Sequence, residues 1–149
     1  MTAATVWLPR DAAALAAGAD EVAAALQAAA TQHKLALNLV RNGSRGLLWL
    51  EPLLEVATPA GRVAFGPLQA GDVDRLVAAG LLDAAVARRG LPEALAADAL
   101  HLGLTEALPY FARQRRITFA RVGVIDPLSL DDYAAHGGWA GLDKALALA

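Results

Sequence analysis

The order of hydrophobic and polar positions in the first forty residues predicts a strand, a helix and a second strand. Residues 5–8 form a short apolar run closed by Pro9, which is typical of a buried strand that ends at a turn. Residues 12–32 are rich in alanine and repeat apolar side chains at helical spacing, with an interruption at Gly18. In residues 34–40 leucines alternate with other residues, as in a strand that buries one face.

The following segments extend this pattern into a mixed α/β domain. Residues 53–58 and 62–66 predict two strands, and the Pro-Ala-Gly sequence between them favours a hairpin turn. Residues 69–79 predict a helix that ends at Gly80. The predicted order of elements is therefore β-α-β-β-β-α. Residues 81–101 have only a thin apolar face, so we expect a linker or a peripheral helix there.

The last forty residues differ in character from the rest. Aromatic side chains become more frequent, and residues 122–127 predict a strand that runs into a turn. Ser129 and Asp132 have the spacing of a capping box, which predicts a short helix that Gly137-Gly138 ends. Residues 142–148 begin another helical pattern. Two alternatives remain for the C-terminal end: the protein ends with an unpartnered helix, or the sequence is part of a longer protein.

Composition and charge exclude several classes of function. The net charge of −2 gives no basic footprint for nucleic acid, and the one basic run, Arg113-Gln-Arg-Arg116, is short enough to be a solvated segment. No apolar run approaches the roughly 18 residues that a membrane span needs. The first residues also lack a basic region followed by an apolar stretch, so we expect no secretory signal and a cytoplasmic protein.

The chain has no cysteine, which excludes disulfide bonds, thiol chemistry and ligation of an iron–sulfur cluster by thiolates. Its three histidines, His33, His101 and His136, fall in three separate segments without the paired spacing of a metal site. Ser44 lies in a glycine-flanked turn that lacks both the P-loop ending and the nucleophile elbow pattern. We therefore predict no catalytic residue and no metal ligand.

One stretch of the sequence resembles a known family. Residues 121–146 are similar to the opening of the flavin- and NADH-binding subunit of respiratory NADH dehydrogenase and its relatives, and Trp139 stands where those proteins usually have tyrosine. The resemblance extends over about 30 residues. The matching residues are Gly123, Ile125, Asp126, Pro127, Ser129, Asp132, Tyr133, Gly137 and Gly138.

The β-α-β-β-β-α order of residues 5–80 is similar to the thioredoxin-like 2Fe–2S ferredoxins of the same enzyme complexes. When their second ligand pair is aligned on Pro52, the motif glycine falls on Gly46 and the two cysteine positions fall on Ser44 and Leu48. The first ligand pair would lie near residues 8–14, where there is also no cysteine. The resemblance therefore implies a thioredoxin-like domain whose ligand positions are degenerate and which holds no cofactor.

A thioredoxin-like domain ahead of a flavin module resembles the β subunit of soluble NAD-dependent formate dehydrogenases, and also the diaphorase subunit of NAD-reducing hydrogenases. The amino-acid sequences of residues 42–52 and 114–121 resemble the formate dehydrogenase subunit more than the hydrogenase subunit. The resemblance implies three parts: a thioredoxin-like domain in residues 1–80, a linker in residues 81–114, and the truncated start of an FMN- and NADH-binding module in residues 115–149.

In the complete subunit of that family, FMN, NAD and a 4Fe–4S cluster carry electrons, and the partners are the other subunits of a multi-subunit dehydrogenase. Their binding segments would follow the residues seen here, so the fragment by itself is expected to be no enzyme. We expect residues 117–149 in isolation to expose apolar surface that faces the missing module. The alternative function is a free-standing thioredoxin-like binding or regulatory protein without redox activity.

Overall fold

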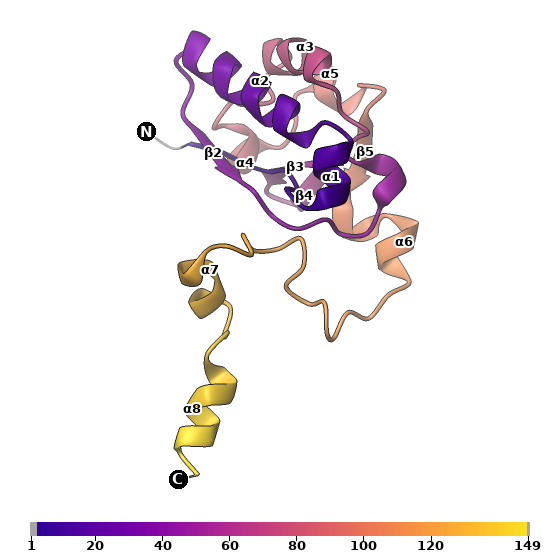
Figure 1. Cartoon of the computed structure of the whole chain (residues 1–149). Helices are drawn as coiled ribbons and strands as arrows, with labels where there is room; N and C mark the ends of the chain where they lie inside the picture. Colours follow the sequence, from indigo (N-terminus) through magenta and orange to yellow (C-terminus); the bar gives the residue numbers. More distant parts are fainter. Residues whose placement is uncertain (1–2, 149) are drawn as a thin grey trace.

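The computed structural model describes residues 3–148, and these residues form one five-stranded mixed sheet covered mainly on one face by helices (Figure 1). The strand order is β2-β1-β3-β4-β5. Strand β1 runs parallel to β2, whereas β3, β4 and β5 each run antiparallel to the preceding neighbour in that order. The strands are β1 (Ala4–Trp7), β2 (Leu37–Val40), β3 (Leu54–Thr58), β4 (Gly61–Phe65) and β5 (His101–Leu104).

A parallel β-α-β unit joined to an antiparallel hairpin and a further helix is the plan of the thioredoxin fold, so the fold class predicted from the sequence is confirmed. The first crossover is made by α1 (Ala12–Ala16) and α2 (Ala19–Gln32), and the last helix of the basic plan is α3 (Val73–Ala78). Gly18 separates α1 from α2 with a φ of 99°, a conformation that glycine adopts without strain.

The remaining helices are short. They are η1 (Leu48–Leu50), η2 (Ala70–Asp72), α4 (Val86–Arg89), α5 (Glu93–Ala96), η3 (Thr105–Ala107), α6 (Pro109–Ala112), α7 (Leu130–Ala135) and α8 (Ala140–Leu146). No helix among residues 3–148 is long and apolar enough to cross a lipid bilayer.

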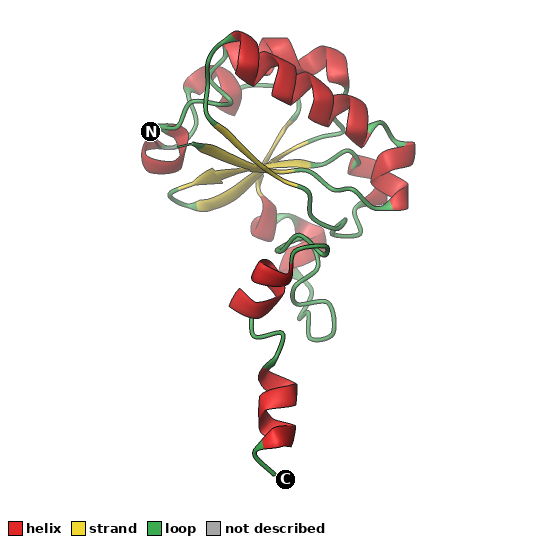
Figure 2. Ribbon diagram, turned by 60° about the vertical axis from the view of Figure 1, so that its left-hand side comes forward, coloured by secondary structure: helices red, strands yellow, loops and turns green. Residues whose placement is uncertain are grey.

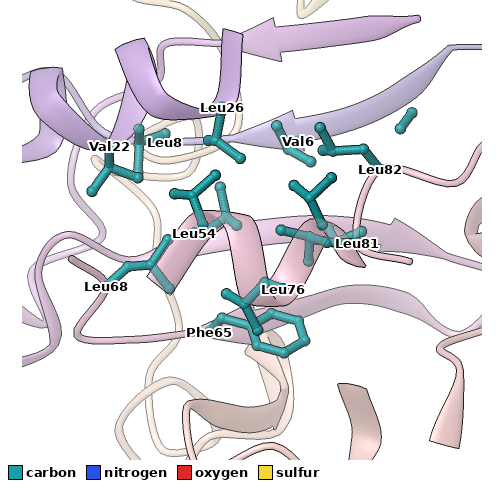
Figure 3. Packing of buried hydrophobic residues seen from close by; sticks show 14 of the residues in the cluster. Val6, Leu8, Val22, Leu26, Leu54, Phe65, Leu68, Leu76, Leu81 and Leu82 are labelled. Atoms are coloured by element: carbon teal, nitrogen blue, oxygen red, sulfur yellow. The ribbon is translucent and has the colours of Figure 1, made fainter. Parts of the chain in front are cut away.

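The main core lies between the sheet and α2 and α3. Alternate strand residues such as Val6, Leu54 and Phe65 point toward Leu26 of α2 and Leu76 of α3, and all five are buried (Figure 3). This arrangement follows from the two periodicities of the chain, because every second strand residue and every third or fourth helix residue meet in one layer. Burial of such side chains is the main source of stability.

Residues 81–104 pack as part of the sheet domain rather than as the linker expected from the sequence. Leu81 and Leu82 join the main core together with Val86 of α4 and Leu95 of α5. Residues 101–104 then pair with β4 as an edge strand. The sequence did not indicate this burial because the few apolar side chains that reach the core come from two four-residue helices and the loops around them, so they form no continuous helical stripe.

The strand expected at residues 122–127 is absent, since that segment forms turns. Gly123 has a φ of 79°, which interrupts an extended conformation. The helix expected from Ser129 is present as α7, and the Ser129 side chain accepts a hydrogen bond from the Asp132 amide at its start. The last helix expected from the sequence is α8, which points away from the sheet (Figure 2).

Substitution of Leu95 tests the inclusion of residues 81–104 in the sheet domain. Leu95→Ala removes a fully buried side chain and should lower the free energy of unfolding by about 2–5 kcal/mol. Leu15→Ala, at a position that is 40% exposed, is the matched control and should change it far less. Urea denaturation followed by circular dichroism measures both. Equal, small effects would mean that the segment is a peripheral linker.

Candidate functional site

The face of the sheet opposite the main core carries the polar residues of the strands. Trp7, Glu55 and Arg62 alternate with core residues on β1, β3 and β4 and therefore point to this second face. A small apolar cluster, which includes Ala64 of β4 and Phe111 of α6, covers part of it. Residues 105–125 lie across the rest.

Glu55 is the centre of a buried ionic cluster on this face. Its side chain is 2% exposed and contacts two guanidinium groups, at 2.5 Å from Nε of Arg45 and 3.2 Å from Nη1 of Arg62. Arg45 also pairs with Glu106, and the Arg62 guanidinium lies 3.6 Å from the centre of the Trp7 ring. Burial raises the pKa of Glu55 and lowers that of Arg62, while their mutual attraction opposes both shifts.

This cluster attaches residues 116–125, which we call the strap, to the sheet. Arg62 donates hydrogen bonds to the carbonyl oxygens of Gly123, at 2.7 Å, and Val124, at 3.0 Å. The buried amide of Asn42 donates to the same Gly123 oxygen at 2.8 Å. Ile125 is buried at the end of the strap. The beginning of the family-like motif is therefore bonded directly to the thioredoxin-like domain.

Gly123 lies directly against the side chain of Arg45. A Cβ atom added there would lie 2.3 Å from Cγ of Arg45, and the φ of 79° is one that other residues avoid. Glycine at this position is therefore explained by the packing of the strap on the buried cluster.

The loop that follows β2 is held by a second network of hydrogen bonds. One carboxylate oxygen of Asp11 accepts from the amides of Ala13 and Ala14 at the start of α1, and the other accepts from the amide of Ser44. The Ser44 hydroxyl donates to Glu51 at 2.6 Å. The single Asp11 side chain therefore ties this loop to the first helix.

The two positions aligned with ferredoxin ligands have no chemistry suited to a cluster. The hydroxyl of Ser44 is engaged with Glu51 and accepts from the Gly46 amide, and the aliphatic side chain of Leu48 in η1 is 59% exposed. Within residues 3–148, no three His, Asp or Glu side chains gather where they could hold a metal ion. A 2Fe–2S cluster, which needs four strong ligands, does not fit this donor set.

The remaining motif residues build the turn and helices after the strap. Asp126 accepts from the Leu128 amide beyond Pro127, and its own amide donates to Asp132 at 2.9 Å. The rings of Tyr133 and Trp139 meet edge to face at 5.1 Å. Gly137 has a φ of 71°, and Gly138 lies directly against the Tyr133 ring. These residues act locally and form no site with Ser44 or Leu48.

An open pocket of about 600 Å³ lies beside the strap. Its walls include Tyr110, Ile117 and Phe119, and the exposed ring of Trp49 stacks edge-on against Tyr110 at 5.6 Å. Arg115 and Arg116 also line it. The sequence analysis did not predict this pocket, because its residues come from the loop after β2, from α6 and from the segment that includes the strap, which only the fold brings together.

The ionic cluster was also missed, although the sequence holds a signal for it. Glu55 and Arg62 interrupt two otherwise apolar strands that a short turn connects. Opposite charges on the same face of a hairpin favour an ion pair. The ion pair between Glu55 and Arg45 has no such signal in the sequence, because Arg45 lies in a loop.

No protein-family model and no curated protein sequence matches the chain significantly. Among solved structures, the chain is similar to the thioredoxin-like [2Fe-2S] ferredoxin from Aquifex aeolicus, with 19% identity and a TM-score of 0.49 over 67% of this chain and 96% of that one. A cysteine-to-serine variant of the same ferredoxin gives 21% identity, a TM-score of 0.49, and coverage of 67% and 98%. Similarity at this level does not extend to function.

Substitution of Gly123 tests the attachment of the strap. Gly123→Ala introduces both a strained φ and a contact with Arg45, and should weaken the attachment by about 1–3 kcal/mol. Hydrogen exchange of the amides in residues 116–125 should then become roughly 5- to 150-fold faster. The control is Gly141→Ala in α8, where the added methyl group has no neighbour within 4 Å and exchange in the strap should not change. Unchanged exchange in Gly123→Ala would contradict the attachment.

Glu51 predicts a pH dependence of stability. Its burial is the largest influence and raises its pKa above the ordinary value of 4.5, so the folded protein binds more protons than the unfolded chain above that pH. The free energy of unfolding should therefore fall as the pH rises from 4.5 through the raised pKa of the folded state. In Glu51→Gln this slope should be smaller, whereas the exposed control Glu21→Gln should keep it. Urea denaturation midpoints measured at a series of pH values from 4.5 upward give this slope. Identical slopes in the wild-type protein, Glu51→Gln and Glu21→Gln would exclude a role of Glu51 in the pH dependence.

Proposed function

We propose that this chain is the N-terminal scaffold and docking domain of an NAD-dependent oxidoreductase subunit similar to the formate dehydrogenase β subunit. The observation that carries the proposal is the direct bonding of the family-like motif to the sheet. Asn42 and Arg62 both donate to the carbonyl oxygen of Gly123, the first matching glycine of that motif. In this proposal, these hydrogen bonds fix the start of the segment that would lead into a following flavin module.

In this proposal the thioredoxin-like domain carries no cluster, and its role is to set the distance and orientation of neighbouring modules. Ser44 and Leu48 occupy the aligned ligand positions, and Ser44 instead fixes the loop through Glu51. FMN, NAD and a 4Fe–4S cluster would be bound by later parts of the subunit, and electrons would pass between them and the other subunits of the dehydrogenase. The equivalent domain of an NADH dehydrogenase or an NAD-reducing hydrogenase would fit the same geometry.

The second candidate is a free-standing thioredoxin-like binding protein, which the exposed pocket around Tyr110 and Phe119 favours. The coding sequence after Ala149 discriminates between the two candidates. A glycine-rich flavin- and NADH-binding region followed by a cysteine cluster is expected for the dehydrogenase subunit. A stop codon at that point would support the binding protein.

Reconstitution with iron and sulfide tests the absence of a cluster in this domain. The purified chain should develop no charge-transfer absorbance in the visible region, because thiolate ligands are missing and Ser44 is hydrogen-bonded to Glu51. A cysteine-containing thioredoxin-like ferredoxin treated in parallel shows that the procedure works. A stoichiometric cluster spectrum from this chain would overturn the scaffold proposal.

A further inference from the structure

The largest apolar side chains exposed on the body of the protein gather around the pocket beside the strap. Ile117 is 78% exposed, Phe119 is 63% exposed and Trp49 is 64% exposed, whereas single exposed leucines elsewhere are scattered. Trp49 contacts Tyr110, and Tyr110 lines the pocket together with Ile117 and Phe119. We call this surface the aromatic surface. Clustered exposed aromatic side chains mark interaction sites more often than isolated ones do.

The segment that forms most of the aromatic surface is basic. Residues 109–125 contain four arginines and no acidic residue. Of these, Arg113 and Arg115 are exposed at the edge of the pocket segment, whereas Arg116 bonds to the backbone of Arg45 and Arg121 lies against the Tyr133 ring. A partner for this surface therefore needs apolar side chains surrounded by negative charge.

The chain itself contains a segment with this chemistry. Residues 126–148, which we call the tail, hold four aspartates and one lysine. The apolar side chains of the tail are exposed on and around α7 and α8, as expected from the sequence: Leu128, Leu130, Trp139, Leu142, Leu146 and Leu148. The tail of the same copy leaves the aromatic surface uncovered, because α8 points away from the sheet (Figures 1 and 2).

We propose that two copies of the chain pair by exchanging tails, so that the acidic, apolar tail of each copy covers the basic aromatic surface of the other. Such a pair is isologous, and the same contact occurs twice. A stable interface buries about 1,200–2,000 Å² in total, so each contact needs only about half of that area. Phe, Tyr and Trp side chains each supply at most about 150–250 Å². The aromatic residues here are partly covered already, so Ile117 and the exposed leucines of the tail supply the rest of the area.

This pairing goes beyond the proposed function and does not depend on it. If the tail leads into a flavin module, exchange would place the module of one subunit beside the thioredoxin-like domain of the other. A monomeric chain would overturn the pairing and leave the docking role untouched. A reconstituted cluster would overturn the scaffold role and leave the pairing untouched.

Charge reversal provides the test, with molecular mass measured by sedimentation equilibrium on the full 149-residue chain. The wild-type chain should have about twice the mass of the 15.4 kDa monomer at tens of micromolar concentration. Two double variants should each be monomeric: Arg113→Glu with Arg115→Glu, which reverses the surface, and Asp131→Lys with Asp143→Lys, which reverses the tail. All four side chains are exposed, and circular dichroism verifies that the variants stay folded.

Mixing the two variants restores both contacts at once. Each mixed pair joins a reversed surface to a reversed tail and a wild-type surface to a wild-type tail, so an equimolar mixture should regain the dimer mass. The control Lys34→Glu with Arg89→Glu changes the net charge as much as the surface variant does, at two exposed positions outside the aromatic surface, and should remain dimeric. A monomeric wild-type chain, dimers in both charge-reversed variants, or a mixture that stays monomeric would each overturn the proposal.

Discussion

The structure depends on the burial of Glu55 between two arginines. An unpaired carboxylate in that position would be strongly unfavourable, and removal of one partner of such a pair costs about 3–5 kcal/mol. Arg62 comes from the neighbouring strand, but Arg45 comes from a loop, and both must be in place before the charge is compensated. The remaining donors of Arg62 then bind Gly123 and Val124, so one buried charge orders the sheet face, the loop and the strap together.

A second network of hydrogen bonds gives the loop after β2 a defined conformation. The Asp11 carboxylate, the Ser44 hydroxyl and the buried Glu51 form a connected set of hydrogen bonds that holds this loop. Under the proposed function, the domain preserves a redox scaffold for its shape. Its contribution to an electron-transfer enzyme is then the distance and orientation of neighbouring modules.

The parts of the chain before and after the strap differ in burial. The sheet domain buries most of its large apolar side chains, apart from those of the aromatic surface and a few single positions, whereas the tail exposes nearly all of its own. A segment that exposes this much apolar surface is typical of an interaction site. The opposite charges of the tail and the aromatic surface supply a specific candidate, and the same surfaces would be available to a following module in a longer subunit.

The sequence by itself determined the order β-α-β-β-β-α and several helix ends, because strand alternation, helical spacing, Gly18 and the Ser129 cap are local properties. It also indicated that the tail would expose apolar surface. Only the tertiary structure decided that β5 completes the sheet, that Leu95 reaches the core, and that residues 122–127 turn rather than extend. These outcomes depend on contacts between residues far apart in the chain. Strand β5 pairs with β4, Leu95 packs in the main core, and Arg62 bonds to the carbonyl oxygens of the turn at residues 123–124. No local pattern encodes such contacts.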